Sequence, residues 1–382
     1  MKNTFIIFNF ILFSFANAEC YELNQSECLY WSDFCEWNEE IDQCQEIGSG
    51  DGGGDADGPY DFAIITESQG LRNGPDYRDG VVYYPIDATP PYKSIVFTPG
   101  WGGNGASMSS WAEFFASHGF IAMTIGPNDE INDDHVMRAE GLFDGIETIT
   151  QENSRSNSPV FDMIDINSFS VGGYSMGGGA CQNAAMMDNS LKAVISLNPT
   201  VLFEDCDLCP AEDYDGVTYC ICLVPELVNH SVPSIIFAGE VEVNELPNYD
   251  GMLGQDIYFN MPLTTDKILF EGSASGHGFA AYPYGDVQEY ALSWLKYQVL
   301  DDGEACESLL VSPSSSSLYL ANIDCVESIL GDVNGDSSVN VQDVILAINL
   351  VLSNEYNISA DLNFDDTVDV LDIVQLVNII LN

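Results

Sequence analysis

Basic side chains are the scarcest chemical group in this chain. Its 382 residues include nine Lys+Arg against 60 Asp+Glu, which gives a formal net charge of −51 at pH 7. A surface this acidic repels phosphate backbones, so we exclude nucleic acid as a partner. The charge indicates a solvated acidic surface of the kind that is tolerated in salty surroundings.

Long apolar runs are also missing. The chain begins with Lys2, a short apolar stretch at 5–15 and the sequence Ala16-Asn17-Ala18, which is typical of a signal peptide with an A-x-A cleavage site. That stretch is too short to span a bilayer, and no later run reaches about 18 apolar residues. We therefore predict a signal peptide at 1–18, no transmembrane anchor, and a secreted, extracellular protein that begins near Glu19.

Cysteine, in contrast, is abundant. Eleven cysteines in a secreted chain predict disulfides within three groups. These groups are Cys20, Cys28, Cys35 and Cys44; Cys206, Cys209, Cys220 and Cys222; and Cys306 with Cys325. The second group also has the spacing of a zinc site, but two disulfides are favoured in an oxidising compartment. Cys181 is left over and is predicted to be a buried free thiol.

Composition divides the mature chain into five segments. We predict a Cys-rich module at 19–47, a Gly/Asp linker at 48–58, a catalytic domain at 59–300, a connector at 301–330 and a separate unit at 331–382. Within the catalytic domain, short apolar runs alternate with amphipathic stretches. The expected strands are 94–98, 121–125, 169–172, 193–197, 234–238 and 267–270, and the expected helices are 109–117, 136–149 and 287–298. This alternation predicts an α/β fold, a mostly parallel sheet flanked by helices.

One serine lies in the frame G-x-S-x-G. The sequence Gly173-Tyr174-Ser175-Met176-Gly177 follows the apolar run 164–171 and precedes a stretch of small residues at 178–187. A nucleophilic serine on a sharp strand-to-helix turn needs glycines beside it, because other side chains would collide with the strand and helix. The pattern predicts Ser175 as a nucleophile.

Such a serine needs a base, and the chain has only four histidines. His277 lies in a glycine-rich loop after the last apolar run, as the chain order serine, acid, histidine requires. We predict it to be the base. His118 is expected to be structural, and His135 and His230 lie in polar, loop-like sequence.

The acid is expected after the apolar run 234–239, where position alone leaves both Glu240 and Glu242 open and Asp250 as a weaker rival. If the strand continues that far, we expect only one of the two glutamates to face the imidazole of His277. The oxyanion donors are expected to be the backbone amides of Met176 and Trp101, although the Pro-Gly before Trp101 also suits an ordinary turn.

These motifs resemble those of the cutinase-like polyesterases, which include poly(ethylene terephthalate) (PET) hydrolases, in the α/β-hydrolase superfamily. The matching runs lie in consistent order between residues 79 and 281, at 80–85, 98–101, 116–122, 142–149, 173–179, 190–193 and 232–235. The resemblance implies an eight- or nine-stranded sheet and hydrolysis of carboxylic esters, polyesters among them, by Ser175, His277 and Glu242, without a cofactor for catalysis.

Three residues depart from that family. Tyr174 stands where the family usually has histidine, Glu242 replaces aspartate, and Thr200 stands in place of an aromatic substrate platform. The last difference makes polymer binding a weaker expectation than ester hydrolysis. We keep two alternatives: a carbohydrate (acetyl or feruloyl) or small-lipid esterase, and a non-catalytic scaffold or adhesion protein on a hydrolase fold.

The end of the chain contains an acidic repeat, 332–343 and 361–372. Each copy places oxygen ligands at positions 1, 3, 5, 9 and 12, and at 7 through a carbonyl, as a Ca²⁺ loop requires. The predicted ligand residues are Asp332, Asn334, Asp336, Ser338, Asn340 and Asp343, and Asp361, Asn363, Asp365, Thr367, Asp369 and Asp372. Each loop precedes an apolar, helix-like stretch, 344–352 and 373–381, and we expect about two structural calcium ions.

The repeat resembles a type I dockerin over residues 331–382, with Asp in place of Glu at position 12. This resemblance implies docking onto a scaffold that bears cohesin modules. The partner-reading pairs would be Val341-Gln342 and Val370-Leu371, which are not the small hydroxyl pair often seen in that family. Cohesin binding is therefore a weaker expectation than calcium binding.

Overall fold

The computed structural model describes residues 35–38, 43–46, 58–201, 228–246, 251–325, 330–334, 338–353, 356–363 and 367–381. The predicted signal peptide, most of the Cys-rich module and the cysteines at 206–222 lie outside these residues. The chain forms two compact units, Met1–Ala291 with Pro313–Asn322, and Leu292–Ser312 with Ile323–Asn382. Each is described by itself.

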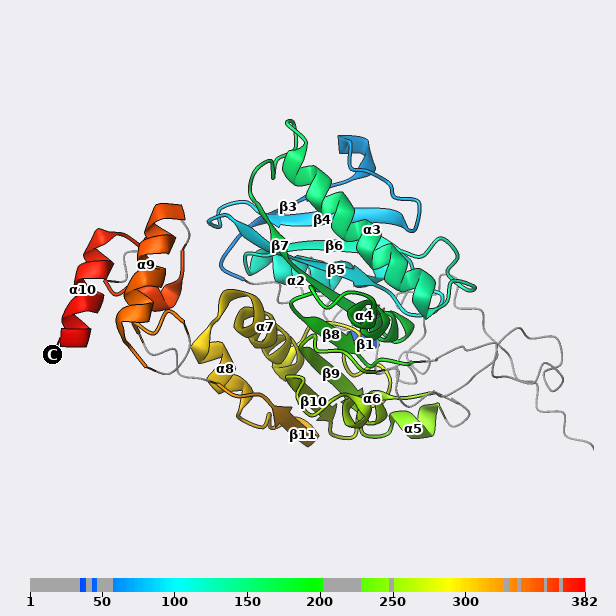
Figure 1. Ribbon diagram of the computed structural model, residues 1–382. Helices are drawn as coiled ribbons and strands as arrows, with labels where there is room; N and C mark the ends of the chain where they lie inside the picture. Colours follow the sequence, from blue (N-terminus) through cyan, green and yellow to red (C-terminus); the bar gives the residue numbers. More distant parts are fainter. Residues whose placement is uncertain are drawn as a thin grey trace, which may run out of the picture. The chain divides into compact units, whose positions relative to one another are not determined.

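A nine-stranded sheet forms the core of the first unit, in the order β11-β10-β9-β8-β7-β5-β6-β4-β3 (Figure 1). The strands are β3 (Phe62–Ile65), β4 (Arg78–Pro85), β5 (Tyr92–Thr98), β6 (Ile121–Gly126), β7 (Ile164–Tyr174), β8 (Val194–Leu197), β9 (Ser234–Gly239), β10 (Lys267–Gly272) and β11 (Ser316–Asn322). The strands from β6 to β10 pair in parallel, whereas β3, β4 and β11 are antiparallel to their neighbours. The predicted mostly parallel sheet with flanking helices is confirmed.

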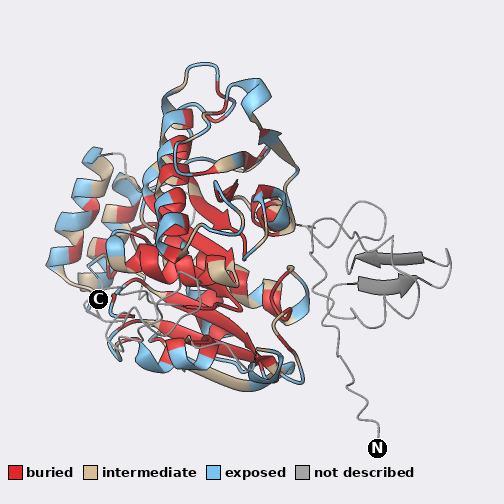
Figure 2. Cartoon of the chain, turned by 90° about the vertical axis from the view of Figure 1, so that its right-hand side faces the viewer, coloured by how far each residue is buried: buried red, intermediate tan, exposed pale blue. Residues whose placement is uncertain are grey.

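Helices cover both faces of this sheet. They are α2 (Ser109–Ser117), α3 (His135–Ser154), α4 (Met176–Met187), α5 (Glu242–Glu245), α6 (Gly254–Asn260) and α7 (Gly285–Leu300), with short 3-10 turns η3 (Glu67–Gln69) and η4 (Gly105–Met108). Side chains alternate along β5. Val96 packs in one buried cluster with Leu142 of α3, whereas Phe97 stacks on Phe115 of α2 with ring centroids 5.7 Å apart. The two helices therefore lie on opposite faces, and Figure 2 shows the sheet buried between such layers.

Two elements were missed in the segment predicted as a connector. Residues 301–330 contain helix α8 (Gly303–Leu309), in the second unit, and the edge strand β11, in the first. The serine-rich sequence at 312–317 hides that strand, because its pairing with β10 supplies an order that its composition does not predict. Cys306 and Cys325 form the predicted disulfide, and Cys181 is a buried free thiol, as predicted.

The second unit contains α9 (Val341–Ser353), the 3-10 turn η5 (Ile358–Ala360) and α10 (Val370–Leu381). Both long helices begin three residues before the predicted apolar stretches. Their small core is centred on Ala347, Ala360, Leu362 and Leu376. Near the other end of the chain, β1 (Cys35–Asn38) and β2 (Gln43–Glu46) form an antiparallel hairpin.

Among the described residues, no helix combines the length and the apolar character that crossing a membrane requires.

Candidate active site

Ser175 lies in the turn between β7 and α4, with φ 54° and ψ −119°. Glycine is required on both sides, because a Cβ on Gly177 would lie 2.2 Å from the Thr98 carbonyl oxygen and one on Gly173 would lie 2.5 Å from Gly177. The Ser175 N–H donates to the Leu197 carbonyl (2.8 Å), and its own carbonyl accepts from the Gly179 amide (3.1 Å). These contacts hold the strained turn in one conformation.

Ser175, His277 and Glu242 form a series of hydrogen bonds. The Ser175 Oγ lies 2.9 Å from His277 Nε2, and His277 Nδ1 lies 2.5 Å from Glu242 Oε1. A carboxylate only accepts, so Nδ1 carries the proton and Nε2 is left to accept the serine proton. The Glu242 residue is only 2% exposed, which strengthens this interaction. The structure thus brings together three residues that are far apart in the sequence.

The extended backbone expected at Glu240 and Glu242 is not found. Strand β9 ends at Gly239, and Glu242 begins a helical turn, so the chain does not continue extended past Glu240. The chain turns because the amides of Glu240 and Val241 donate to the carbonyls of Gly272 and Ser275. Glu240 instead accepts from the Ala274 amide (2.6 Å), and Asp250 lies outside the described residues. Only Glu242 of the two glutamates meets the imidazole.

Asn198 was not singled out from the sequence. Its Nδ2 donates to Glu242 Oε2 (3.2 Å) and to the Gly276 carbonyl (3.3 Å), and its Oδ1 accepts from the Ala280 amide (2.7 Å). The residue is fully buried and has φ 43°, a conformation that asparagine tolerates better than most residues. It links the acid to the loop that carries His277. The only hint in the sequence is a polar residue directly after the apolar strand β8.

Two further side chains hold the backbone of His277. The Tyr174 hydroxyl donates to the His277 carbonyl (3.0 Å), and their rings are 5.4 Å apart. Glu245 Oε2 accepts from the His277 amide (2.6 Å). Tyr174, a departure from the resembled family, therefore helps to position the loop that carries His277.

The two expected oxyanion donors belong to residues close to Ser175. Met176 is the first residue of α4, where amides have no partner within the helix. Gly100 approaches so closely that a Cβ on it would lie 2.9 Å from Ser175 Cβ, which brings Trp101 next to the serine. Within the described residues, neither the Trp101 nor the Met176 amide makes a hydrogen bond. Both amides are thus available to an oxygen atom.

His135 and His230 are both buried, 4% exposed, and of the two only His230 lies in a loop, since His135 begins α3. Burial lowers the pKa of each imidazole to about 4, so both are neutral at pH 7. His135 Nε2 binds the Thr200 carbonyl (2.6 Å), and His230 Nε2 binds Gln182 Oε1 (2.8 Å). His118 ends α2, with its Nδ1 at the Phe114 carbonyl (2.7 Å).

Thr200, whose carbonyl binds His135, is also buried. The residue is 7% exposed, and its amide donates to the Ser175 carbonyl (3.0 Å). It therefore offers no flat surface to a substrate. Trp101 is 64% exposed, and its indole Nε1 donates to the Ile131 carbonyl (3.1 Å). Trp101 is thus an exposed aromatic residue on the loop whose Gly100 packs against Ser175.

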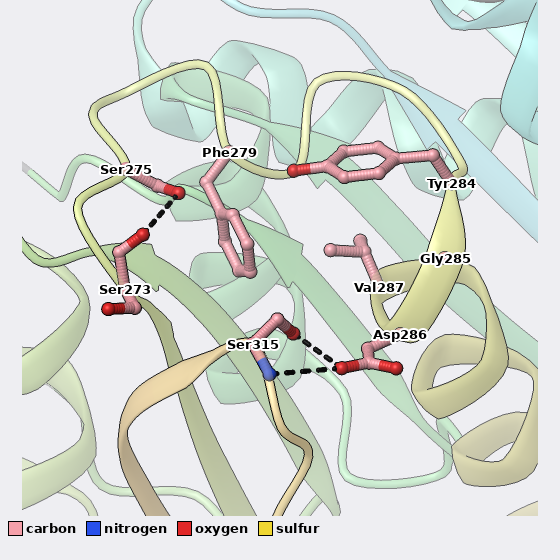
Figure 3. A pocket seen from close by; sticks show the side chains of 8 residues that line it. All are labelled: Ser273, Ser275, Phe279, Tyr284, Gly285, Asp286, Val287 and Ser315. Carbon is pink, nitrogen blue, oxygen red and sulfur yellow. Dashed lines mark hydrogen bonds between the residues drawn. The ribbon is translucent and has the colours of Figure 1, made fainter.

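A cavity of about 460 Å³ adjoins the loop that carries His277 (Figure 3). Its lining is Ser273, Ser275, Phe279, Tyr284, Gly285, Asp286, Val287 and Ser315. Asp286 accepts from both the amide (3.2 Å) and the hydroxyl (2.5 Å) of Ser315. Ser175, His277 and Glu242 do not line this cavity, so it lies beside the site and is not part of it.

The two acidic loops of the second unit have the same internal hydrogen bonds. Asp343 is fully buried; its Oδ1 accepts from the amides of Val333 and Asn334, and its Oδ2 from that of Asn340. Asp372, also fully buried, repeats these bonds at the same offsets, to the amides of Leu362, Asn363 and Asp369. In each loop the aspartate at position 12 thus binds the backbone amides of positions 2, 3 and 9.

The chemistry of these loops suits a divalent cation. Asp332 and Asp361, at position 1, are 5% and 1% exposed, and no Lys, Arg or His follows Lys296 in the sequence. A cation stabilises buried carboxylates, and the sequence after Lys296 contains no basic side chain that could supply one. Within the described ranges no three acidic, His or Cys side chains converge on one point, and Asp336 and Asp365 lie outside those ranges.

Two family models match segments of this chain. Residues 55–205 match the family model described as PET hydrolase-like, and residues 330–381 match the Dockerin type I domain. The chain therefore contains one segment similar to PET hydrolases and another similar to type I dockerin domains.

Curated relatives cover about two thirds of the chain. Cutinase est2 of Thermobifida alba is 26% identical over 262 residues, 68% of this chain and 77% of that protein. The cutinase of Thermobifida fusca (strain YX) is 26% identical over 253 residues, 66% of this chain and 74% of its own length. The bis(hydroxyethyl) terephthalate hydrolase of Streptomyces coelicolor is 25% identical over 265 residues, 69% and 74% respectively. Two of these relatives are named as cutinases and one as a terephthalate hydrolase.

Proposed function

We propose that this chain is a secreted serine hydrolase that cleaves carboxylic esters, cutin-like or aromatic polyesters among them, through an acyl-enzyme. The observation that carries the proposal is the series Ser175, His277 and Glu242 at a G-x-S-x-G turn. Nucleophile, base and orienting acid in this order are the arrangement that acyl transfer requires. The cutinase and terephthalate-ester hydrolase relatives support the same reaction.

In the first half of the reaction, His277 Nε2 takes the proton of Ser175 as its Oγ attacks the ester carbonyl carbon. The negative charge that forms on the carbonyl oxygen is held by the Trp101 and Met176 amides. The carbon–oxygen bond to the alcohol then breaks, and the alcohol leaves with the proton from His277. Glu242 stabilises the imidazolium throughout and keeps the proton on Nδ1 before the attack.

In the second half, His277 takes a proton from water, and the resulting hydroxide attacks the acyl carbon. The same two amides hold the second oxyanion. The bond from Ser175 Oγ to the acyl carbon breaks, Oγ regains its proton from His277, and the acid departs.

The substrate class is argued from Trp101. Trp101 is 64% exposed on the loop whose Gly100 packs against Ser175, and its ring would offer a flat apolar surface to an aromatic or aliphatic acyl group. Buried Thr200 supplies no second platform. A second candidate is an acetyl or feruloyl esterase acting on carbohydrate, which the type I dockerin domain favours because such a domain suits a cell-wall-degrading complex.

Replacement of the nucleophile tests the mechanism. Ser175→Ala should lower turnover by on the order of 10⁶ with an unchanged fold, and it should abolish labelling by a fluorophosphonate probe. Activity within tenfold of wild type would refute the serine mechanism. Absence of labelling in the wild-type protein would favour the non-catalytic scaffold. A screen over short esters, cutin, PET and acetylated or feruloylated glycans then ranks the substrate classes.

For the second unit we propose about two structural calcium ions and a cohesin-bearing partner outside the cell. The match to the Dockerin type I domain and the paired acidic loops support calcium. Exposed apolar side chains stand at equivalent positions of α9 and α10: Val341 and Ile345 are 64% and 56% exposed, and Val370 and Val374 are 62% and 53% exposed. Such paired apolar faces suit a protein partner. Binding of the full chain to an immobilised cohesin, with and without a chelator, tests this assignment.

A further inference from the structure

Arg138 of α3 is a buried guanidinium that binds only carbonyl oxygens. The residue is 1% exposed, and its Nη1 donates to the carbonyls of Pro99 (3.1 Å) and Gly100 (3.3 Å). Its Nη2 donates to the Glu130 carbonyl (3.0 Å), and its Nε to the Asp133 carbonyl (3.1 Å). Within the described part of the chain, no carboxylate forms an ion pair with it.

This burial is costly. Desolvation lowers the pKa of Arg138, and nearby acidic residues, Asp133 first among them, raise it again. The chain has only nine Lys and Arg residues, yet Arg138, in the first turn of α3, binds four neutral carbonyls. A guanidinium can make such contacts in several directions at once because its five N–H groups form a rigid planar fork.

The Gly100 carbonyl, which also accepts from the Gly103 amide (3.1 Å), fixes the direction of an expected oxyanion donor. The Gly100 carbonyl and the Trp101 N–H belong to the same peptide group, which is trans and therefore directs them to opposite sides. Because Arg138 holds the Gly100 carbonyl toward α3, the Trp101 N–H of the same peptide group points away from α3. Gly100 itself packs against Ser175, since a Cβ on it would lie 2.9 Å from Ser175 Cβ.

The same guanidinium also links this loop to a second one. Arg138 and the Gly102 amide (2.9 Å) both donate to the Glu130 carbonyl, and the Trp101 indole donates to the Ile131 carbonyl. The loop that contains Trp101 is therefore fixed at three consecutive residues. No other described cation contacts it.

We propose that Arg138 is the positioning residue of the oxyanion pocket: it holds the Gly100–Trp101 peptide so that the Trp101 N–H faces the oxygen formed when Ser175 attacks. The inference rests on the proposed serine mechanism. Arg138 itself touches no reacting atom. Its effect is preorganisation, since a donor already aimed at the developing charge needs no rearrangement during the reaction.

The test compares Arg138→Lys with Arg72→Lys. Arg72 is a matched control because it also binds α3, at the Asp144 carbonyl (3.1 Å) and at Thr148 Oγ1 (2.9 Å), and none of its contacts lies on the Trp101 loop. Each variant is assayed with p-nitrophenyl butyrate and with a trifluoromethyl ketone. The ketone forms a tetrahedral adduct on Ser175 whose oxygen carries the negative charge.

Per titrated active site, we expect Arg138→Lys to lower kcat by about 10², with KM within about threefold. The inhibition constant of the ketone should rise by a similar factor, because lysine cannot hold both carbonyls. Arg72→Lys should lower the melting temperature and leave kcat and the inhibition constant within about threefold of wild type.

Unchanged kcat and inhibition constant in Arg138→Lys would overturn the proposal, and so would a fall in kcat with unchanged ketone binding. If Arg138→Lys does not fold, Arg138→Gln, whose shorter amide reaches one carbonyl at most, is held to the same criteria. Failure of the serine mechanism itself would be seen separately, as activity that survives Ser175→Ala.

Discussion

Replacing Glu242 by glutamine should disable the site by a mechanism that can be traced atom by atom. Glu242 Oε1 accepts from His277 Nδ1 at 2.5 Å, while Oε2 accepts from Asn198 Nδ2 (3.2 Å) and the Gly239 amide (3.1 Å). Every neighbour is thus a donor, and the carboxylate is the only acceptor among them. A glutamine has one acceptor oxygen and one NH₂ group, so it cannot satisfy both sides.

Two orientations are open to the glutamine. If its oxygen faces His277, its NH₂ group meets two buried donors, which costs about 1–3 kcal/mol for each unsatisfied group. If its NH₂ group faces His277, the imidazole must carry its proton on Nε2, where it can no longer accept the proton of Ser175. In both cases the charge that stabilises the imidazolium is lost. We expect kcat to fall by about 10⁴, or about 5 kcal/mol in the barrier.

Glu240→Gln is the matched control. Glu240 lies two residues away and accepts from the Ala274 amide (2.6 Å), not from the imidazole, so its loss should lower kcat less than tenfold. Both variants are assayed with p-nitrophenyl butyrate after circular dichroism and active-site titration establish the folded fraction. The reverse ranking would assign the acid to Glu240. Small and equal losses would refute an orienting role for both, and would direct attention to Asp250.

Other contacts make further predictions. Asn198→Gly, which accepts the positive φ but lacks the amide, should lower kcat about 10- to 100-fold through misorientation of Glu242; wild-type kcat would show that this amide is dispensable. His135 has a pKa of about 4 when folded and about 6.5 when unfolded, so the unfolded chain binds more protons between these values and stability should fall as the pH drops from 6.5 to 4. Melting curves should show a weaker fall over that window in His135→Gln, and identical slopes would contradict this cause. Calorimetry of the full chain should detect about two calcium ions and lose one in Asp343→Ala; no calcium heat would refute the assignment.

Much of the fold follows from patterns that are local in the sequence. The alternation of apolar runs and amphipathic stretches predicts the sheet and its main helices, because periodicity is a property of one segment at a time. Ser175 is marked by two glycines within two residues of it, and each acidic loop contains its whole ligand pattern within twelve residues. Strand β11 was missed for the converse reason: its order comes from pairing with β10 and not from its own serines.

Which carboxylate meets the imidazole was decided only in three dimensions. Glu240 and Glu242 are equivalent by composition and position, and the turn after Gly239 separates them by directing one to Ala274 and the other to His277. The same holds for Asn198, whose partners lie 44 to 82 residues away in the sequence, and for Arg138, which reaches back to Gly100. A hydrogen bond depends on distance and direction in space, and a sequence pattern records neither for residues that the fold alone brings together.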